Sequence, residues 1–185
     1  LYTTALRQKN FYLKTVFPTP YTGLHEWTMS YAIKLDRNKD NQAVLSPDFY
    51  SRVTADGALQ MKVGETDDPK AFAKTKLQPG KWYYIAWVYK NQHVRCYING
   101  VLDNEFDVPK VETFTKLNMS WGAFEGYVRE IRLYDKALTA FQIADNLYIE
   151  TPDNPDLLFY APLDKKTGIK DVSKKQNTIK VYVPG

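Results

Sequence analysis

The chain has 185 residues, which is enough for one well-buried core and short for two ordinary domains, so we expect a single domain over residues 1–185. The net charge of +4 is small and dispersed, which gives no support for a nucleic-acid partner, and no apolar run of about twenty residues could act as a transmembrane segment. Cys96 is the only cysteine, which excludes an internal disulfide, and only His25 and His93 accompany it, which argues against a zinc site.

The first part of the chain predicts β-structure. Aromatic residues make up 15% of the sequence, and flat or β-branched side chains suit a pleated sheet better than a helix. Short runs of alternating polar and apolar residues recur between turn signals, at the spacing of a β-sandwich. In chain order these runs are 11–17, 27–35, 42–45, 49–54, 59–63 and 72–77.

Residues 81–106 predict a three-stranded antiparallel meander. Asn99-Gly100 supplies the positive φ that a tight hairpin requires, as Asp56-Gly57 does earlier in the chain. Lys90-Asn91-Gln92 provides the remaining reversal.

The run 82–89 is apolar on both sides, unlike a strand with one solvated face. Alternation separates it into two rows. They are Trp82, Tyr84, Ala86 and Val88, and Tyr83, Ile85, Trp87 and Tyr89. One row must face the core, and the other is either covered by more protein or offers aromatic rings to a ligand.

The next strand of the meander has one core face and one outer face. Val94, Cys96 and Ile98 form the core row, so Cys96 is predicted to be a small buried hydrophobe. The alternate residues form the outer row, and they are His93, Arg95 and Tyr97.

The last third of the chain predicts further strands and one short helix. Strand candidates cover 116–124 and 126–134, after which Leu138, Phe141, Ile143 and Ala144 fall at helical spacing. Thr139 is placed to cap a helix over 139–147. A linker at 151–155 precedes strands at 157–163 and 179–183. Because about thirty residues cannot bury a core, we expect 151–185 to pack on the same sandwich, the alternative being the start of a truncated second module.

Two segments carry a family resemblance. Gly80-Lys81-Trp82, followed by Tyr97-Ile98-Asn99-Gly100, resembles the central hairpin of laminin G-like domains. The run from Phe124 to Thr139, FEGYVREIRLYDKALT, resembles the closing strand and short helix of that family. The resemblance implies an all-β fold, an antiparallel β-sandwich of the concanavalin A-like jelly-roll type with one short surface helix. The closing strand of that family commonly carries acidic residues where this chain has Arg129 and Glu130, so the resemblance assigns no role to this position.

The same resemblance implies a non-catalytic carbohydrate-binding or adhesion module, of the type found in exported, multimodular bacterial surface proteins. Its expected partners are a polysaccharide or glycan and other domains of the same polypeptide, and its expected location is extracellular or at the cell surface. The chain begins at Leu1 without Met, which suggests a fragment or a processed product. The alternatives are a glycan-acting enzyme with an unrecognised site and a structural or protein-binding sandwich.

No catalytic residues are predicted. Glycosidases of this fold place two carboxylates on one strand, about 5 Å apart for a retaining mechanism. Glu105-Phe106-Asp107 begins such a pattern, but the next position on that face is Pro109, and Lys110 stands where a bulged variant needs its second Glu. The pattern is therefore incomplete.

Five residues are candidates for carbohydrate contact. The outer row at 93–97 combines charged groups with an aromatic ring, and two further rings lie near strand ends or loops, although each could equally be a packing residue. The candidates are His93, Arg95, Tyr97, Trp121 and Tyr127. The lysines from Lys165 to Lys180 could contact an anionic glycan or membrane, or only keep the surface solvated.

A calcium site is the only cofactor that the sequence suggests. Asp36, Asn38 and Asp40 alternate as oxygen ligands do in calcium loops. The completing acid is missing, because position twelve of that register is Pro47 and Asp48 stands one place beyond. A polar hairpin loop without a metal fits the same residues.

Overall fold

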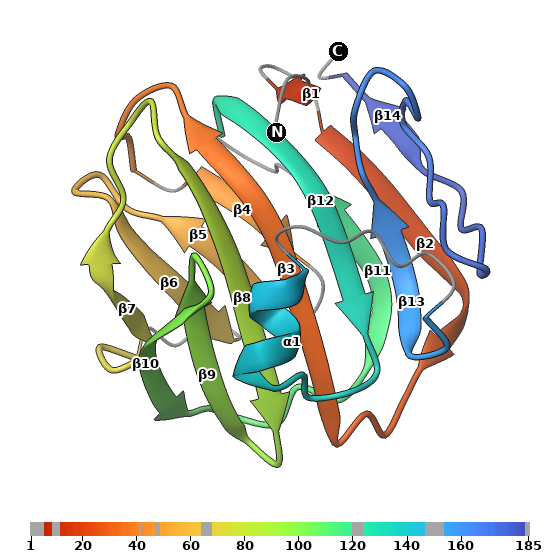
Figure 1. Cartoon of the computed structure of the whole chain (residues 1–185), viewed down its shortest axis with the longest axis horizontal. Helices are drawn as coiled ribbons and strands as arrows, with labels where there is room; N and C mark the ends of the chain where they lie inside the picture. Colours follow the sequence, from red (N-terminus) through yellow and green to blue (C-terminus); the bar gives the residue numbers. More distant parts are fainter. Residues whose placement is uncertain are drawn as a thin grey trace.

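The computed structural model describes residues 6–8, 12–40, 42–46, 49–63, 68–119, 124–146 and 154–183. They form two stacked antiparallel sheets of seven strands each, with one short helix against the outside of one sheet (Figure 1). This architecture confirms the predicted all-β sandwich. The described part of the chain contains no helix that is long and apolar enough to cross a bilayer.

The first sheet has the order β1-β12-β3-β8-β9-β10, and β13 also pairs with β12. β1 and β13 pair with opposite ends of β12. The strands are β1 (Leu6–Gln8), β12 (Gly126–Tyr134), β3 (Glu26–Leu35), β8 (Trp82–Lys90), β9 (His93–Ile98), β10 (Val101–Asp107) and β13 (Leu157–Ala161).

The second sheet has the order β14-β2-β11-β4-β5-β6-β7. Its strands are β14 (Lys180–Tyr182), β2 (Tyr12–Tyr21), β11 (Phe114–Met119), β4 (Gln42–Ser46), β5 (Phe49–Val53), β6 (Ala58–Val63) and β7 (Phe72–Lys76). Residues 157–183 thus add one strand to each sheet, β13 beside β12 and β14 beside β2.

The predicted hairpins have the expected backbone. Asn99 and Gly100 adopt φ values of 52° and 83°, and Asn91 and Gln92 adopt 48° and 63°, so β8, β9 and β10 form the predicted meander. Gly57 adopts φ 83° in the earlier turn, where a Cβ atom would lie 2.3 Å from the backbone oxygen of Leu77. A glycine is therefore required at this turn for both conformation and space.

The core fills the space between the two sheets and takes the odd-numbered row of β8. Tyr83, Ile85, Trp87 and Tyr89 belong to it. The Trp87 Nε1 atom donates to the Ser51 hydroxyl of the opposite sheet at 3.0 Å, so a hydrogen bond joins the layers inside the core. Cys96 is fully buried there, as predicted.

A second buried cluster answers the question raised by the other row of β8. Tyr84, Ala86 and Val88 lie on the outer side of the first sheet under a further layer of protein. The covering residues include Leu138, just before the helix, and Ile143, inside α1 (Ala140–Asp145). The helix crosses in front of this sheet (Figure 1). Most of this outer row is therefore covered by protein.

The structure confirms the predicted cap of the helix and buries Ile143 among the apolar residues within it. Thr139 is the N-cap, and its hydroxyl accepts a hydrogen bond from the Gln142 amide at 3.2 Å. Phe141 is 75% exposed, because a helix this short presents little more than Ile143 to the sheet. Phe141 shares the helical spacing but faces solvent, and the predicted end of the helix at residue 147 lies outside the described residues.

Candidate functional site

The edge strands of the two sheets, β10 and β7, are joined by polar side chains. A bulge lies in β10 between Leu102 and Asn104. The Asp103 carboxylate in this bulge accepts hydrogen bonds from the backbone amides of Lys74 and Thr75, at 2.5 and 3.2 Å. The Asn104 side-chain amide donates to the Phe72 backbone oxygen at 2.8 Å. These contacts fix the position of the strand segment that follows.

That segment brings two carboxylates to one histidine. Beyond the bulge, Glu105 pairs with Arg95 and Asp107 pairs with His93, so all four side chains emerge on the outer side of the first sheet. The Nδ1 atom of His93 lies 2.8 Å from an Asp107 oxygen, and its Nε2 atom lies 2.9 Å from a Glu105 oxygen. Arg95 approaches Glu105 more loosely, at 3.9 Å.

This arrangement favours the charged form of the imidazole. Hydrogen bonds to Asp107, and then to Glu105, raise the pKa of His93 above its ordinary value. The side chain of His93 remains 37% exposed and that of Asp107 91% exposed, so both are accessible to a ligand.

An open groove of about 760 Å³ runs beside this cluster. Half-buried Phe72 contributes an apolar ring to its lining, and His93, Glu105 and Asp107 contribute polar groups. The lining also includes Asp68, Pro69, Lys70, Ala73, Lys74, Asn104 and Phe106. A smaller hollow of about 300 Å³ shares Asp68 and Pro69 with the groove. The site therefore combines a partly exposed ring with charged and amide groups.

Tyr97 does not join this site. It lies on the predicted outer face of β9 but is only 4% exposed, because it packs in the same buried cluster as Leu138 and Ile143. The ring of Tyr97 is a packing element in this structure, and its contact with a ligand stays a prediction.

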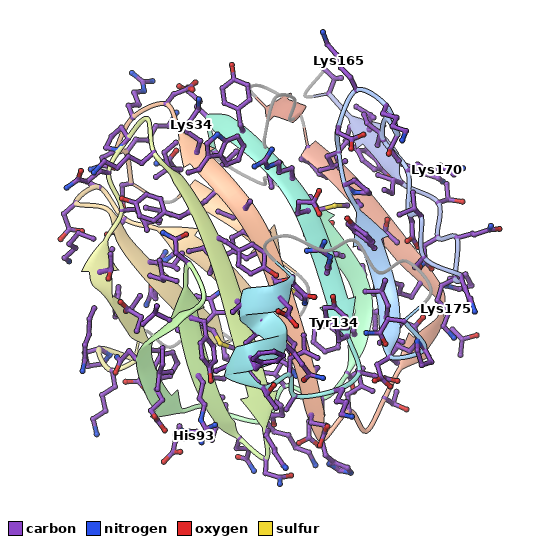
Figure 2. All side chains as sticks on the ribbon, in the orientation of Figure 1. Lys34, His93, Tyr134, Lys165, Lys170 and Lys175 are labelled. Atoms are coloured by element: carbon purple, nitrogen blue, oxygen red, sulfur yellow. The ribbon has the colours of Figure 1, made fainter. Side chains whose placement is uncertain are left out.

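Tyr127 lies at the other end of the first sheet. It is half-buried, its ring centroid is 6.4 Å from that of Trp82, and the Lys34 ammonium lies 5.1 Å from its ring. Lys34 pairs with Trp82 at the start of β8, whereas His93 pairs with Lys90 at the end of β8. Figure 2 shows this separation between the labelled Lys34 and His93. The candidate Trp121 lies outside the described residues.

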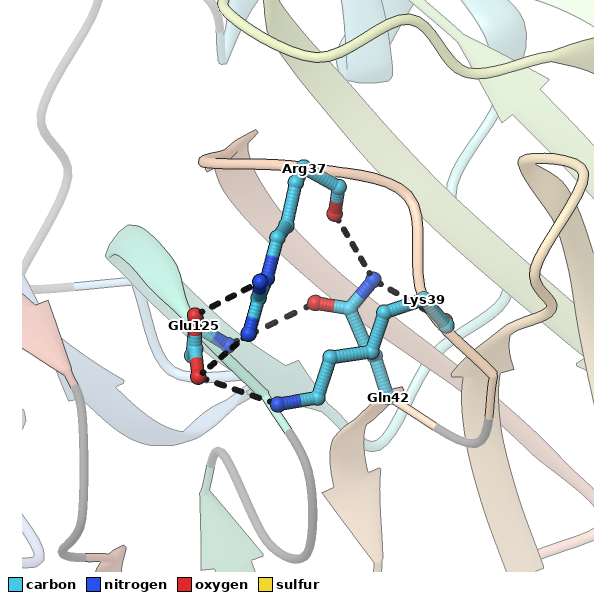
Figure 3. Close-up of polar contacts among 4 residues, drawn as sticks. All are labelled: Arg37, Lys39, Gln42 and Glu125. Atoms are coloured by element: carbon cyan, nitrogen blue, oxygen red, sulfur yellow. Dashed lines mark hydrogen bonds and ion pairs between the residues drawn. The ribbon is translucent and has the colours of Figure 1, made fainter.

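The loop proposed for calcium contacts Glu125, the residue just before β12. Asp36, Asn38 and Asp40 are all exposed. The loop instead directs cations to Glu125, with Arg37 at 3.3 Å and Lys39 at 3.0 Å (Figure 3). Within the described ranges, no three His, Cys, Asp or Glu side chains are placed to hold a metal ion. Calcium binding by this loop stays a prediction.

The family model of the concanavalin A-like lectin/glucanases superfamily matches residues 10–144. The chain belongs to this superfamily. The matched range contains both sheets except β1, β13 and β14, and it includes the whole His93 cluster. No curated protein shows significant sequence similarity to the chain.

Solved structures share the fold of this superfamily member at low sequence identity. A provisionally assigned carbohydrate-binding protein from Bacteroides ovatus has a TM-score of 0.77 and 21% identity, and the match covers 97% of this chain and 60% of that one. A heptameric SAP-like pentraxin from Limulus polyphemus has a TM-score of 0.62 and 14% identity, covering 97% and 93%. Domain 4 of the extracellular arabinanase AbnA from Geobacillus stearothermophilus, solved with arabinotriose, has a TM-score of 0.51 and 21% identity, covering 66% of each chain.

Sequence reasoning considered Glu105 and Asp107 only as a catalytic pair and did not connect them with His93. Their alternation places the two acids on one face of the strand, but regular pairing from the hairpin would not bring that face to the side of His93. The sequence pattern also gives no indication of Phe72 or Asp68, because these groove residues come from the edge of the other sheet.

Proposed function

We propose that this chain is a non-catalytic glycan-binding module and that the groove beside His93 holds the sugar. The observation that carries the proposal is the His93 ring held between Glu105 and Asp107 at the margin of an open groove. Binding sites for small ligands combine apolar surface with a few well-placed polar groups. Here Phe72 offers the apolar ring, and the charged groups can exchange hydrogen bonds with sugar hydroxyls.

The arrangement of the carboxylates favours binding over hydrolysis. A glycosidase needs its two carboxyl groups on either side of the bond that breaks, one as acid and the other as base or nucleophile. Glu105 and Asp107 instead hydrogen-bond to the two nitrogens of one imidazole ring. One oxygen of each acid contacts His93, and the remaining lone pairs can accept hydrogen bonds from sugar hydroxyls, so we assign both acids to ligand recognition.

Structural relatives support the same class of function. The Bacteroides ovatus protein is provisionally assigned to carbohydrate binding, and the arabinanase domain was solved with arabinotriose. This chain spans 60% of the length of the Bacteroides ovatus protein. We extend the proposal to a module of a longer, exported protein that acts at the cell surface or outside the cell.

A glycan array combined with reducing-sugar assays tests the proposal. We expect retention on a subset of glycans without turnover, and His93→Ala should weaken that retention about tenfold because it removes the centre of the cluster. His25→Ala is the matched control, since the side chain of His25 is exposed and contacts Glu112 rather than Glu105 or Asp107. Turnover would assign the chain to the enzymes. Retention that His93→Ala leaves unchanged, or no retention on any glycan, would reject the groove as a glycan site.

A further inference from the structure

A second polar cluster lies on the outer side of the first sheet, on β12 in the region of Tyr134, which is labelled in Figure 2. The guanidinium of Arg132 is buried there, with a side chain only 2% exposed. Its Nη2 atom donates to Glu130 at 2.9 Å and to the Tyr160 hydroxyl at 3.1 Å. The same hydroxyl donates to Glu130 at 2.7 Å.

A bulge in β12 places this charge on the outer face. Arg129 pairs with Ala32 and Arg132 pairs with Ser30, so three steps along β12 correspond to two along β3. Glu130 in the bulge has φ 55°. Residues three apart on a regular strand point to opposite faces, whereas the bulge turns Arg129 and Arg132 to the same face. The guanidinium of Arg129 stacks on Trp82, with the Cζ atom of Arg129 4.2 Å from the centroid of the Trp82 ring.

Several buried donors in this cluster lack acceptors. The Nε and Nη1 atoms of Arg132 have no hydrogen-bond partner among the described residues, and neither do the hydroxyls of Ser30 and Tyr84. Ser30 is the direct cross-strand partner of Arg132, and Tyr84 pairs with Ala32, two residues further along β3. The donors therefore occupy neighbouring positions on three adjacent strands.

The charge of Arg132 persists despite its burial. Burial alone would lower the pKa of this guanidinium, but Tyr84, Tyr160, Tyr134 and Glu130 more than offset that effect, and the pKa is raised. Buried polar groups in folded proteins nearly always have partners, and a group without one calls for an explanation such as a bound ligand or ion. A charged donor is satisfied best by a charged acceptor.

We propose that Arg132, Ser30 and Tyr84 bind the carboxylate group of a small acidic ligand. Arginine N–H groups match carboxylate oxygens in geometry and charge. The summed formal charge of Arg129, Arg132 and Glu130 is +1. A monoanion neutralises this charge, whereas a dianion would leave a net charge of −1. The inference does not rest on the proposed function, because three strands separate β12 from β10, a distance of about 19 Å at the usual strand spacing.

Thermal unfolding and calorimetric titration of the full chain test this assignment at constant ionic strength. The probes are sodium acetate, sodium glucuronate, neutral methyl glucoside and sodium sulfate. We expect saturable binding and a rise in Tm with a carboxylate, and no effect of methyl glucoside at equal concentration. Equal binding of acetate and glucuronate identifies a free carboxylate as sufficient, and binding of glucuronate alone identifies an acidic sugar; both support the site. Absence of carboxylate binding, or a preference for sulfate, overturns it.

Conservative variants locate the binding. The double variant Ser30→Ala with Tyr84→Phe removes two hydroxyls and keeps the buried charge, and it should weaken carboxylate binding about tenfold. Tyr97→Phe is the matched control, since Tyr97 is buried in the same outer cluster as Tyr84. Arg132→Lys should weaken binding further, and if that variant fails to fold the double variant decides. Unchanged affinity in the double variant rejects the site. His93→Ala should leave carboxylate binding intact, which separates this test from that of the groove.

Discussion

The outer side of the first sheet carries two clusters of similar chemistry in opposite environments. At the sheet edge, His93 lies 2.9 Å from Glu105, and both side chains are more than one-third exposed. On β12, which has paired strands on both sides, Arg132 lies at the same 2.9 Å from Glu130, and its side chain is 2% exposed. An exposed pair contributes about 0–1 kcal/mol, whereas removing one partner of a buried pair costs about 3–5 kcal/mol. The same distance therefore corresponds to different contributions to stability. Only the edge cluster can give up its internal contacts to a ligand with little loss in the free energy of unfolding.

The largest expected effect follows from removing the acid of each pair. Glu130→Gln keeps the size of the side chain and leaves the charge of Arg132 without its carboxylate, so the free energy of unfolding should fall by about 3 kcal/mol. Glu105→Gln should change it by less than about 0.5 kcal/mol. Urea denaturation followed by circular dichroism measures both variants. Equal losses would show that burial does not distinguish the two clusters.

Most of the fold follows from local rules, and these rules are visible in the sequence. Alternation along β9 assigns Cys96 to the core, and Asn99-Gly100 fixes the adjoining hairpin because both residues accept positive φ. His93 and Arg95 were placed correctly on the outer face. Alternation gives only the face, however, and says nothing about the layer that covers it. This is why Tyr97 lies on the predicted side of the sheet and is nevertheless buried.

The two clusters were not predictable because each depends on a bulge. From Asn99-Gly100, regular pairing places Tyr97 opposite Leu102 and would continue with Glu105 opposite Val94, on the core side. The bulge at Asp103 moves Glu105 opposite Arg95 instead.

The bulge at Glu130 has the same effect on β12, since alternation would send Arg129 and Arg132 to opposite faces. Each bulge is held by contacts from distant chain segments. Asp103 binds amides of β7, and the Glu130 amide donates to the Pro162 oxygen at 3.1 Å. Contacts of this kind do not appear in a local sequence pattern.

A smaller effect is expected from loosening the bulge at the edge. Asp103→Ala removes the acceptor for the amides of Lys74 and Thr75, so the free energy of unfolding should fall by about 1 kcal/mol. Glycan retention should weaken as well, because Glu105 and Asp107 lose the register that directs them to His93. Urea denaturation and the glycan array measure the two effects on one preparation.

Asp40→Ala serves as the control for this variant, because Asp40 is an exposed acid in another loop. In calcium-free buffer it should alter neither stability nor retention. If Asp103→Ala lowers stability but leaves retention unchanged, the bulge supports the fold without orienting the site.

The smallest expected effect is a pH dependence confined to the edge cluster. The pKa of His93 is raised in the folded chain by Asp107 and Glu105, and in the unfolded chain it is about 6.5. A raised pKa means that the folded state binds the proton more tightly. Its stabilising contribution is therefore complete below about pH 6.5 and disappears as the pH rises through the folded value. Because the cluster is exposed and screened, we expect about 0.5 kcal/mol or less.

The difference between wild type and His93→Gln isolates this contribution. Urea denaturation across the neutral range should show the wild type losing stability relative to the variant as the pH rises, and added salt should reduce the difference. Arg132 does not titrate in this range, so its pair should give no such slope. A relative gain of stability with rising pH would mean that His93 is held neutral in the folded chain. A neutral imidazole carries one N–H, so only one of the two acids could then accept a hydrogen bond from the ring.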